Sequence, residues 1–256
     1  MRHLKKVVSA MLNPLGLELV RRKPAPELEG MEDLSGREKS ILSTVMPYTM
    51  TGPLRVAALL HSVRYLVSSG VPGDIVECGV WRGGGMMAAA LSLLALGDTS
   101  RNLYLYDTFE GLPPPTEADV GYDGTPAREQ FDRIMQKEGA AWCYSGIDEV
   151  RNNMAATGYP MGKVIFVKGK VEVTIPQTLP GQIGLLRLDT DWYESTRHEL
   201  IHMLPLLVRH GILIIDDYGH WQGAKKAVDE YFAALGWVPY LHRIDYAGRI
   251  FVLGQA

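Results

Sequence analysis

Two apolar stretches of the sequence each end in a pair of aspartates. Asp216 and Asp217 follow the run GILII, and Asp189 and Asp191 follow the run IGLLRL. Short apolar runs are typical of buried strands, and neighbouring strands lie about 5 Å apart. Carboxylates at that distance repel one another unless they bind protons or a cation. Because oxygen ligands suit a hard ion such as Mg²⁺ or Ca²⁺, the four aspartates predict a metal site.

A second set of residues is suited to hold a small organic ligand. The motif VECGVWRGGG contains Glu77, Gly79 and Gly83, which end a predicted strand and open a helix. Glycines let the backbone approach a ligand, and the start of a helix offers free N–H groups. The spacing differs from the G-x-G-x-x-G dinucleotide fingerprint, and Glu77 attracts an amino group or a sulfonium, which favours S-adenosylmethionine over a nicotinamide cofactor. Asp107 ends the next predicted strand, where a carboxylate can accept both ribose hydroxyls.

A metal site beside a sulfonium donor indicates alkylation of a hydroxyl group. A bound cation lowers the pKa of a hydroxyl, and a remaining carboxylate can take its proton as general base. The alternative for Asp216 and Asp217 alone is a strand end with one solvated aspartate and one helix cap. An iron enzyme is a further alternative, but it needs imidazole ligands, and only His220 lies near the aspartates in sequence.

The elements that position these residues alternate along the chain. Near-continuous apolar strands separated by helices predict a mostly parallel seven-stranded sheet covered on both faces, with an antiparallel C-terminal hairpin. In such sheets, ligands bind at the carboxyl ends of the strands, where the acidic residues lie. The predicted strands are 74–80, 102–109, 163–169, 183–191, 211–218, 238–245 and 248–254; the predicted helices are 54–69, 86–96, one from about 127, 146–157 with Asp148 as N-cap, 194–210 ended by Gly211, and 224–235.

Composition limits the classes of function. The chain has 256 residues and a net charge of −3, so no bulk charge favours nucleic acid. Cys78 and Cys143 lie far apart and belong to no C-x-x-C pair, which argues against zinc ribbons and fits the cytoplasm. No apolar run approaches the length of a membrane span.

The first 46 residues are predicted to form an extension, and residues 47–256 the catalytic domain. Apolar residues between Leu4 and Leu15 recur at helical spacing beside basic residues. We favour a docking or dimerisation helix there, and hence a homo-oligomer, over a helix that contacts a membrane surface. Residues 20–40 are polar, contain prolines and are predicted to be a linker.

Five segments of the sequence resemble the macrocin O-methyltransferase family, and the resemblance runs from about residue 47 to the C-terminus. It implies a class I methyltransferase, Rossmann-like fold. It also implies S-adenosylmethionine- and Mg²⁺-dependent methylation of sugar hydroxyls on natural products such as macrolides and aminocoumarins. The segments are YTMTGPLRVAALLHSVRYLV, VPGDIVECGVWRGGG, LYLYDTFEGLP, LRLDTDWYEST and GILIIDDYGHWQGAKKAVDEY.

Roles follow from this resemblance at each matching position. It makes Asp191 the general base, and it places Thr51 near the methionine end of the cofactor. The other roles that it implies are metal ligation by Asp189, Asp216 and Asp217, and cofactor binding by Glu77, Gly79 and Asp107. The segment GKVEVTIP lacks the aromatic residue expected after the third strand, so no adenine contact is assigned.

Several polar and aromatic residues have two interpretations. The loop 111–126 resembles a lid that selects the acceptor. Trp192 and Tyr193 either line an acceptor pocket or pack under the following helix, and His220 could contact substrate. His198 and His202 lie four residues apart on a predicted helix and are expected at its surface. A catechol-type O-methyltransferase acting on a phenol is the main rival function.

Overall fold

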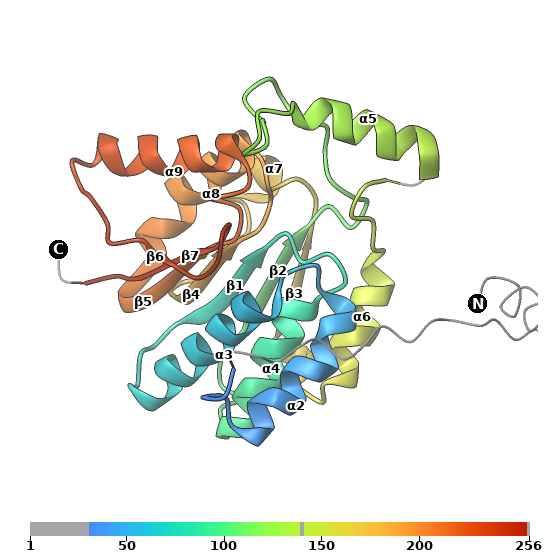
Figure 1. Cartoon of the computed structure of the whole chain (residues 1–256). Helices are drawn as coiled ribbons and strands as arrows, with labels where there is room; N and C mark the ends of the chain where they lie inside the picture. Colours follow the sequence, from blue (N-terminus) through green and yellow to red (C-terminus); the bar gives the residue numbers. More distant parts are fainter. Residues whose placement is uncertain (1–30, 139–140, 255–256) are drawn as a thin grey trace, which may run out of the picture.

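A seven-stranded sheet organises residues 31–138 and 141–254, the part of the chain that the computed structural model describes (Figure 1). The strands lie in the order β3-β2-β1-β4-β5-β7-β6. Their bounds are β1 Asp74–Cys78, β2 Leu103–Asp107, β3 Val164–Lys168, β4 Ile183–Leu188, β5 Leu207–Ile215, β6 His242–Arg243 and β7 Arg249–Val252. The α-helices are α2 Gly36–Val45, α3 Pro53–Ser68, α4 Gly84–Leu96, α5 Ala127–Glu138, α6 Ile147–Ala156, α7 Val171–Thr174, α8 Tyr193–Met203 and α9 Gln222–Ala234.

The direction of the strands confirms the predicted architecture. Strands β1 to β5 pair in parallel, whereas β7 is antiparallel to both β5 and β6. Strand β1 lies between β2 and β4, so the strand order reverses beside it. A crevice forms at the carboxyl ends of the strands at such a reversal. The topology therefore brings the ends of β1, β2, β4 and β5 together.

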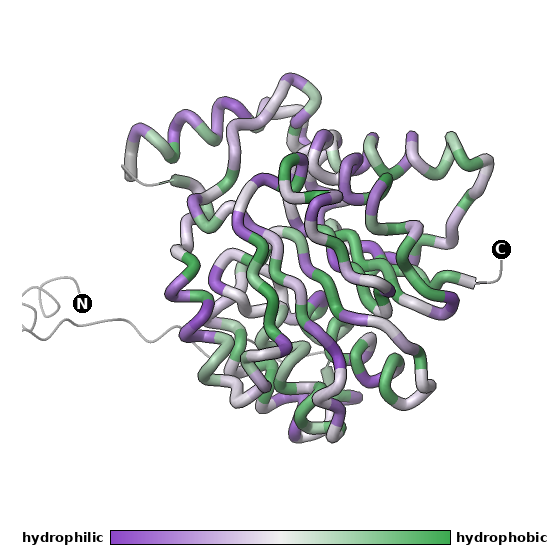
Figure 2. The backbone as a smooth tube through the Cα atoms, turned by 180° about the vertical axis from the view of Figure 1, so that it is seen from behind, coloured by the Kyte–Doolittle hydropathy of each residue, from purple (hydrophilic) through white to green (hydrophobic). Residues whose placement is uncertain are grey.

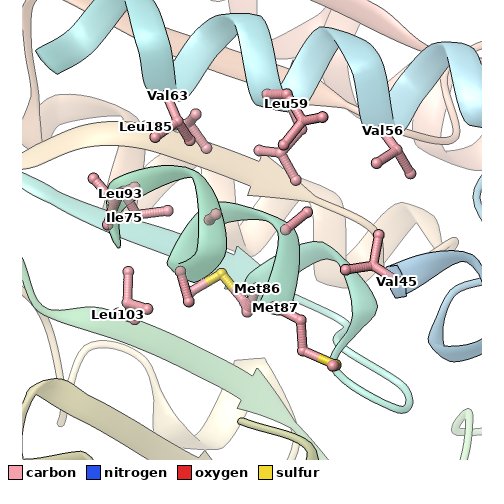
Figure 3. Packing of buried hydrophobic residues seen from close by; sticks show 14 of the residues in the cluster. Val45, Val56, Leu59, Val63, Ile75, Met86, Met87, Leu93, Leu103 and Leu185 are labelled. Atoms are coloured by element: carbon pink, nitrogen blue, oxygen red, sulfur yellow. The ribbon is translucent and has the colours of Figure 1, made fainter. Parts of the chain in front are cut away.

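Each face of the sheet has its own apolar core. On one face, α3 and α4 pack against the strands, and Figure 3 shows Val56 and Leu59 of α3 above Met86 of α4. On the other face, Leu200 of α8 and Phe232 of α9 belong to a second cluster. Alternate residues of a strand point to opposite faces, and both sets are apolar here because helices cover both faces.

Figure 2 shows the central strands as mostly hydrophobic and α5 as mostly hydrophilic. In Figure 1, α5 stands away from the sheet, at the edge where the strands end. Across residues 31–138 and 141–254, no helix has both the length and the apolar character needed to cross a membrane.

The predicted helix 194–210 is wrong at its C-terminal end. Helix α8 stops at Met203, a 3₁₀ turn covers Leu204–Leu206, and β5 begins at Leu207. Pro205 has no N–H to donate and cannot continue the helix. Leu207 instead pairs with Ile183 of β4. The predicted N-cap of α6 is also wrong, because Gly146 rather than Asp148 occupies it.

The predicted linker 20–40 is wrong from Gly36 onward, where α2 begins. Ser35 and Glu38 form a capping box, and Ile41 and Leu42 join the core of the first face. An S-x-x-E pattern before apolar residues signals a helix start, so the sequence did carry this information. The predicted helix 4–15 lies outside the described residues, and the domain boundary at residue 46 stays a prediction.

Candidate active site at the strand ends

One cavity at the carboxyl ends of the strands is lined by most of the predicted site residues. Gly83 is the exception. It lies at the N-cap of α4 with φ +86°, while Gly85, two residues later, lines the cavity. The role of Gly83 as a cofactor contact stays a prediction. The predicted residues in the lining are Thr51, Glu77, Gly79, Asp107, Asp189, Asp191, Asp216 and Asp217.

Gly79 forms the tight turn that lets the cavity open between β1 and β4. Its φ is +82°, and a Cβ atom there would lie 1.9 Å from the carbonyl oxygen of Asp189. Only glycine adopts this conformation without strain, and only glycine leaves room for the neighbouring strand end. Gly79 therefore lets the turn after β1 lie close to Asp189 at the end of β4.

Glu77 is a buried acid with one free oxygen. It is 2% exposed, and its Oε1 pairs with Nη1 of Arg187. Its Oε2 is buried and has no hydrogen-bond partner among the described residues. Burial raises the pKa of Glu77 to about 7, although the guanidinium of Arg187 opposes the shift. A buried oxygen without a donor is unfavourable, so the geometry suits a ligand that supplies one, such as an ammonium group.

Asp107 binds the backbone of its own and the neighbouring turn. Its Oδ2 accepts hydrogen bonds from the N–H groups of Val80, at 2.8 Å, and Trp81, at 3.0 Å, and its Oδ1 accepts one from Phe109, at 2.7 Å. Burial raises the pKa of Asp107, and these three N–H groups oppose the shift. The Thr108 hydroxyl also lies 3.4 Å from Oδ1, but it is closer to the carbonyl of Gly111, at 2.6 Å. A carboxylate has about four acceptor positions, so one remains only weakly used and could accept a ribose hydroxyl.

Three aspartates cluster as the sequence predicted. One carboxylate oxygen from each of Asp189, Asp216 and Asp217 lies within 4.8 Å of the others. Burial raises the pKa of Asp189 and of Asp217 well above the usual range, and repulsion from neighbouring carboxylates adds to both shifts. At neutral pH both carboxyl groups therefore tend to hold a proton. A cation bound between them would replace these protons and balance the charge.

Two arginines that the sequence analysis missed hold this cluster. Arg187 reaches Asp216 Oδ1 at 2.5 Å and Asp189 Oδ2 at 2.8 Å, besides its bond to Glu77. Arg55, from α3, pairs with the other oxygen of Asp216. Arg187 is the one charged residue in the run IGLLRL, and that break in a buried strand was the signal available in the sequence.

Thr51 lies at the centre of these contacts. Its hydroxyl donates to Asp216 Oδ2 at 3.1 Å and accepts from Arg187 Nη2 at 2.7 Å. The side chain is 7% exposed and still lines the cavity. Its position next to the methionine end of a cofactor stays a prediction.

Asp191 is held in an unusual backbone conformation beside the cluster. Its φ is +67°, a left-handed value that is uncommon for residues other than glycine. Its N–H donates to Asp217 Oδ2 at 3.2 Å, and its Oδ1 accepts from the indole of Trp221 at 2.7 Å. Burial raises the pKa of Asp191 to about 7, despite the hydrogen bond from Trp221. A carboxyl group that titrates near neutrality is suited to general base catalysis.

Aromatic residues form the far end of the cavity. Trp142, Trp221, His220 and Tyr246 line it, and the Tyr246 hydroxyl lies 3.1 Å from His220 Nδ1. Trp192 is 4% exposed and packs against Trp221 with ring centroids 5.0 Å apart. Trp192 lies outside the cavity lining and supports the wall from behind, by packing against Trp221 and against Ala224 of α9.

Tyr193 and His198 make contacts outside the cavity. The Tyr193 hydroxyl donates to Glu230 Oε2 at 2.7 Å, on the outside of the molecule. His198 is half-buried, and its Nε2 lies 2.9 Å from the carbonyl of Ile175. The ring centroids of His198 and His202 lie 4.5 Å apart at a tilt of 51°, both side chains are half-buried, and both lie outside the cavity lining.

The geometry can be compared with known proteins. The model of the family described as macrocin-O-methyltransferase (TylF) matches residues 10–252. The chain belongs to this family. Because the family model begins before Gly36, it includes helix α2, which the resemblance from residue 47 left out.

Members of the macrocin O-methyltransferase family are similar along most of this chain. The 8-demethyl-8-(2,3-dimethoxy-alpha-L-rhamnosyl)-tetracenomycin-C 4'-O-methyltransferase of Streptomyces olivaceus is 34% identical over 78% of this chain and 74% of its own length. The mycinamicin III 3''-O-methyltransferase of Micromonospora griseorubida is 31% identical over 78% of this chain and 76% of its own. The solved structure of the O-methyltransferase NovP is 30% identical, with a TM-score of 0.70 over 81% of this chain and 83% of that one. The chain is therefore an O-methyltransferase with the S-adenosylmethionine-binding fold of its class.

Proposed function

We propose that this enzyme transfers the methyl group of S-adenosylmethionine to a hydroxyl of a sugar on a glycosylated small molecule, with Mg²⁺ bound in the site. The observation that carries the proposal is one cavity that holds two different acidic sites. Oε2 of Glu77 is buried and has no hydrogen-bond partner in the part of the chain that the structure describes, and three aspartates cluster at the ends of β4 and β5. The relative from Streptomyces olivaceus acts on a rhamnosyl-bearing tetracenomycin, as its name states, which supports the same acceptor class here.

Glu77 and Asp107 would hold the donor at the ends of β1 and β2. The free Oε2 of Glu77 fits the amino group of the donor, which supplies the missing hydrogen-bond donor. The remaining acceptor position of Asp107 fits a ribose hydroxyl. The turn at Gly79 keeps side chains out of the space between these two carboxylates.

Asp189, Asp216 and Asp217 would hold the metal ion. Their oxygens form the hard donor set that Mg²⁺ prefers. Burial and repulsion between the carboxylates raise the pKa of Asp189 and of Asp217, and a cation would relieve that repulsion, which supports a metal site here. When bound, the cation orients the acceptor hydroxyl and lowers its pKa.

Asp191 would take the proton of the acceptor hydroxyl. The indole of Trp221 fixes Oδ1 of its carboxylate, which orients the group beside Asp217 and the aspartate cluster. The pKa of about 7 lets Asp191 accept a proton near neutral pH. The aromatic rings of Trp142 and Trp221, which line the same cavity, would limit the access of water to the bound acceptor.

The experiment that tests this function is a methyl-transfer assay with acceptors of two classes, in Mg²⁺ and in excess chelator. The sugar-bearing class is represented by the rhamnosyl-bearing tetracenomycin in the name of the Streptomyces olivaceus relative, and the phenolic class by catechol. We expect transfer to the sugar-bearing acceptor only, and loss of turnover with chelator that added Mg²⁺ restores. Turnover of catechol alone would favour the catechol-type alternative, and full activity in chelator would refute the role of the metal.

We also place the enzyme in the cytoplasm, since Cys78 and Cys143 are both unpaired. Free thiols are typical of reducing compartments. Fractionation of the cells that produce the protein, followed by immunoblotting, tests this placement, and recovery in the secreted fraction would contradict it.

A further inference from the structure

The segment 111–126, which joins β2 to α5, is bound to the chain that follows β5. The N–H of Tyr122 donates to the carbonyl of His220 at 2.9 Å. The N–H and the side-chain amide of Gln222 donate to the carbonyls of Val120, at 2.8 Å, and Gly121, at 2.9 Å. These bonds place the segment over the end of the sheet that carries the aspartate cluster.

Asp119 joins this segment to a third element, the start of α8. Its Oδ1 accepts the N–H of Tyr193, the first residue of α8, at 2.8 Å. Its Oδ2 accepts both the N–H and the hydroxyl of Thr116, at 2.7 and 2.8 Å. The side chain is 1% exposed, although it lies in a polar loop. The buried carboxylate of Asp119 thus joins the segment 111–126 (the lid segment) to the N-terminus of α8.

Helix α8 depends on this outside partner. A helix start leaves N–H groups that a side chain at the N-cap usually satisfies. The N-cap residue here is Trp192, whose indole is a donor only and cannot accept the N–H. That indole instead donates to the carbonyl of Pro113 in the lid segment, at 2.9 Å. Asp119 therefore performs a capping function from 74 positions away in sequence.

Helix α9 is shaped around the same contact. Gly223 is the second residue of α9, and a Cβ atom there would lie 2.4 Å from Asp119 Oδ1 and 3.2 Å from the Tyr193 nitrogen. Glycine is unfavourable in a helix compared with alanine. Its presence at this position leaves the space in which Asp119 reaches Tyr193.

The contact lies two residues from Asp191. Asp191, with its left-handed backbone and its bond to Trp221, directly precedes Trp192 and Tyr193, which are both bound to the segment 111–126. We infer that Asp119 is a positioning residue, which sets the carboxylate of Asp191 by fixing the start of α8 to the lid segment. The inference rests on the proposed function for the role of Asp191 as base.

Four variants test the inference. Asp119→Ala removes both halves of the contact, and Asp119→Asn keeps an oxygen for Tyr193. Gly223→Ala leaves every polar group in place but pushes Asp119 aside. Glu117→Ala is the matched control, because Glu117 is exposed in the same loop and makes no hydrogen bond or ion pair with the residues described.

The first readout is steady-state kinetics with the acceptor identified in the methyl-transfer assay. A misplaced catalytic group costs up to about a hundredfold, so we expect Asp119→Ala and Gly223→Ala to lower kcat by about ten- to a hundredfold. We expect the KM for S-adenosylmethionine to change less than about twofold, because the donor site lies on β1 and β2. Asp119→Asn should lie between wild type and Asp119→Ala, and Glu117→Ala should match wild type.

The second readout is hydrogen exchange of the peptides 111–127 and 189–200 in the enzyme without ligands. We expect both peptides to lose protection together in Asp119→Ala and Gly223→Ala, and neither to do so in Glu117→Ala. Unchanged kcat in both test variants, or a loss of protection confined to peptide 111–127, would overturn the inference. If wild type methylates no acceptor, the proposed function fails, and joint loss of protection would still support the link between Asp119 and α8.

Discussion

Replacement of Glu77 by glutamine tests the donor site most directly. Glu77 lies in the centre of the sheet with one oxygen on Arg187 and the other free. Arg187 keeps Asp189 and Asp216 as partners when Glu77 is neutralised, so the variant should fold. We therefore expect Glu77→Gln to weaken binding of the donor without breaking the site.

The size of the effect follows from the charge and pKa of Glu77. A hydrogen bond to a charged group contributes about 1.5–3 kcal/mol, so the loss should be about ten- to a hundredfold in Kd. Because the pKa of Glu77 is about 7, the ionised fraction rises from about one-tenth at pH 6 to about nine-tenths at pH 8. Only the ionised carboxylate pairs with an ammonium group, so wild type should bind about tenfold more tightly at pH 8 than at pH 6.

Calorimetric titration with S-adenosylhomocysteine, which carries the same amino group, measures both effects. The titrations run at pH 6, 7 and 8 on wild type, Glu77→Gln and the exposed control Glu117→Gln. The pH dependence should vanish in Glu77→Gln and persist in the control. A wild-type affinity that does not change with pH, or a Glu77→Gln affinity within about twofold of wild type, would refute the reasoning.

Three further predictions concern the base and the packing. Asp191→Asn should lower kcat by about 10²–10⁴-fold in a methyl-transfer assay and leave S-adenosylhomocysteine binding unchanged; a smaller loss would exclude Asp191 as base. Gly79→Ala should lower the free energy of unfolding measured in urea by at least ~2 kcal/mol, because the alanine would have a strained positive φ and its Cβ would clash with the backbone of Asp189. Gly97→Ala also has a positive φ but open space around its Cβ, so it should lower the same free energy by only about 1 kcal/mol. Glu199 is buried in α8 under Thr190, and burial raises its pKa well above the usual range, so the folded state holds a proton that the unfolded state releases above pH ~4.5. The stability of the wild-type protein should therefore fall as pH rises from 5 to 8, and Glu199→Gln should reduce this fall in thermal melts. An equal dependence of melting temperature on pH in the two proteins would contradict the raised pKa of Glu199.

The sequence predicted the sheet well because its signals are local. Apolar runs bounded by glycine and proline mark strands β1 to β5, and the acids at their ends mark the cavity. The end of α8 was missed because helical periodicity continued past Met203, whereas Pro205 and the pairing of Leu207 with β4 decided the outcome. Pairing of this kind depends on a strand distant in sequence.

The site was predicted in its acids but not in their partners. Arg187 stood out as a charge within a buried strand, so closer attention to that residue could have found it. The contacts Trp221–Asp191 and Asp119–Tyr193 span 30 and 74 positions, and no local pattern in the loop 111–126 predicts which aspartate will be buried. Such partners become visible only when the sheet has brought the strand ends together.

The way in which the segment 111–126 is attached has a consequence for how such enzymes diversify. Its bonds to residues 219–223 use main-chain carbonyl and amide groups on its own side, at Val120, Gly121 and Tyr122. Main-chain groups are present whatever the side chains are, so this attachment tolerates almost any sequence. The lid role predicted for the segment would therefore let its side chains be exchanged while this main-chain attachment is preserved. One backbone arrangement of this kind can serve many acceptors, provided that Asp119 and Gly223 are kept.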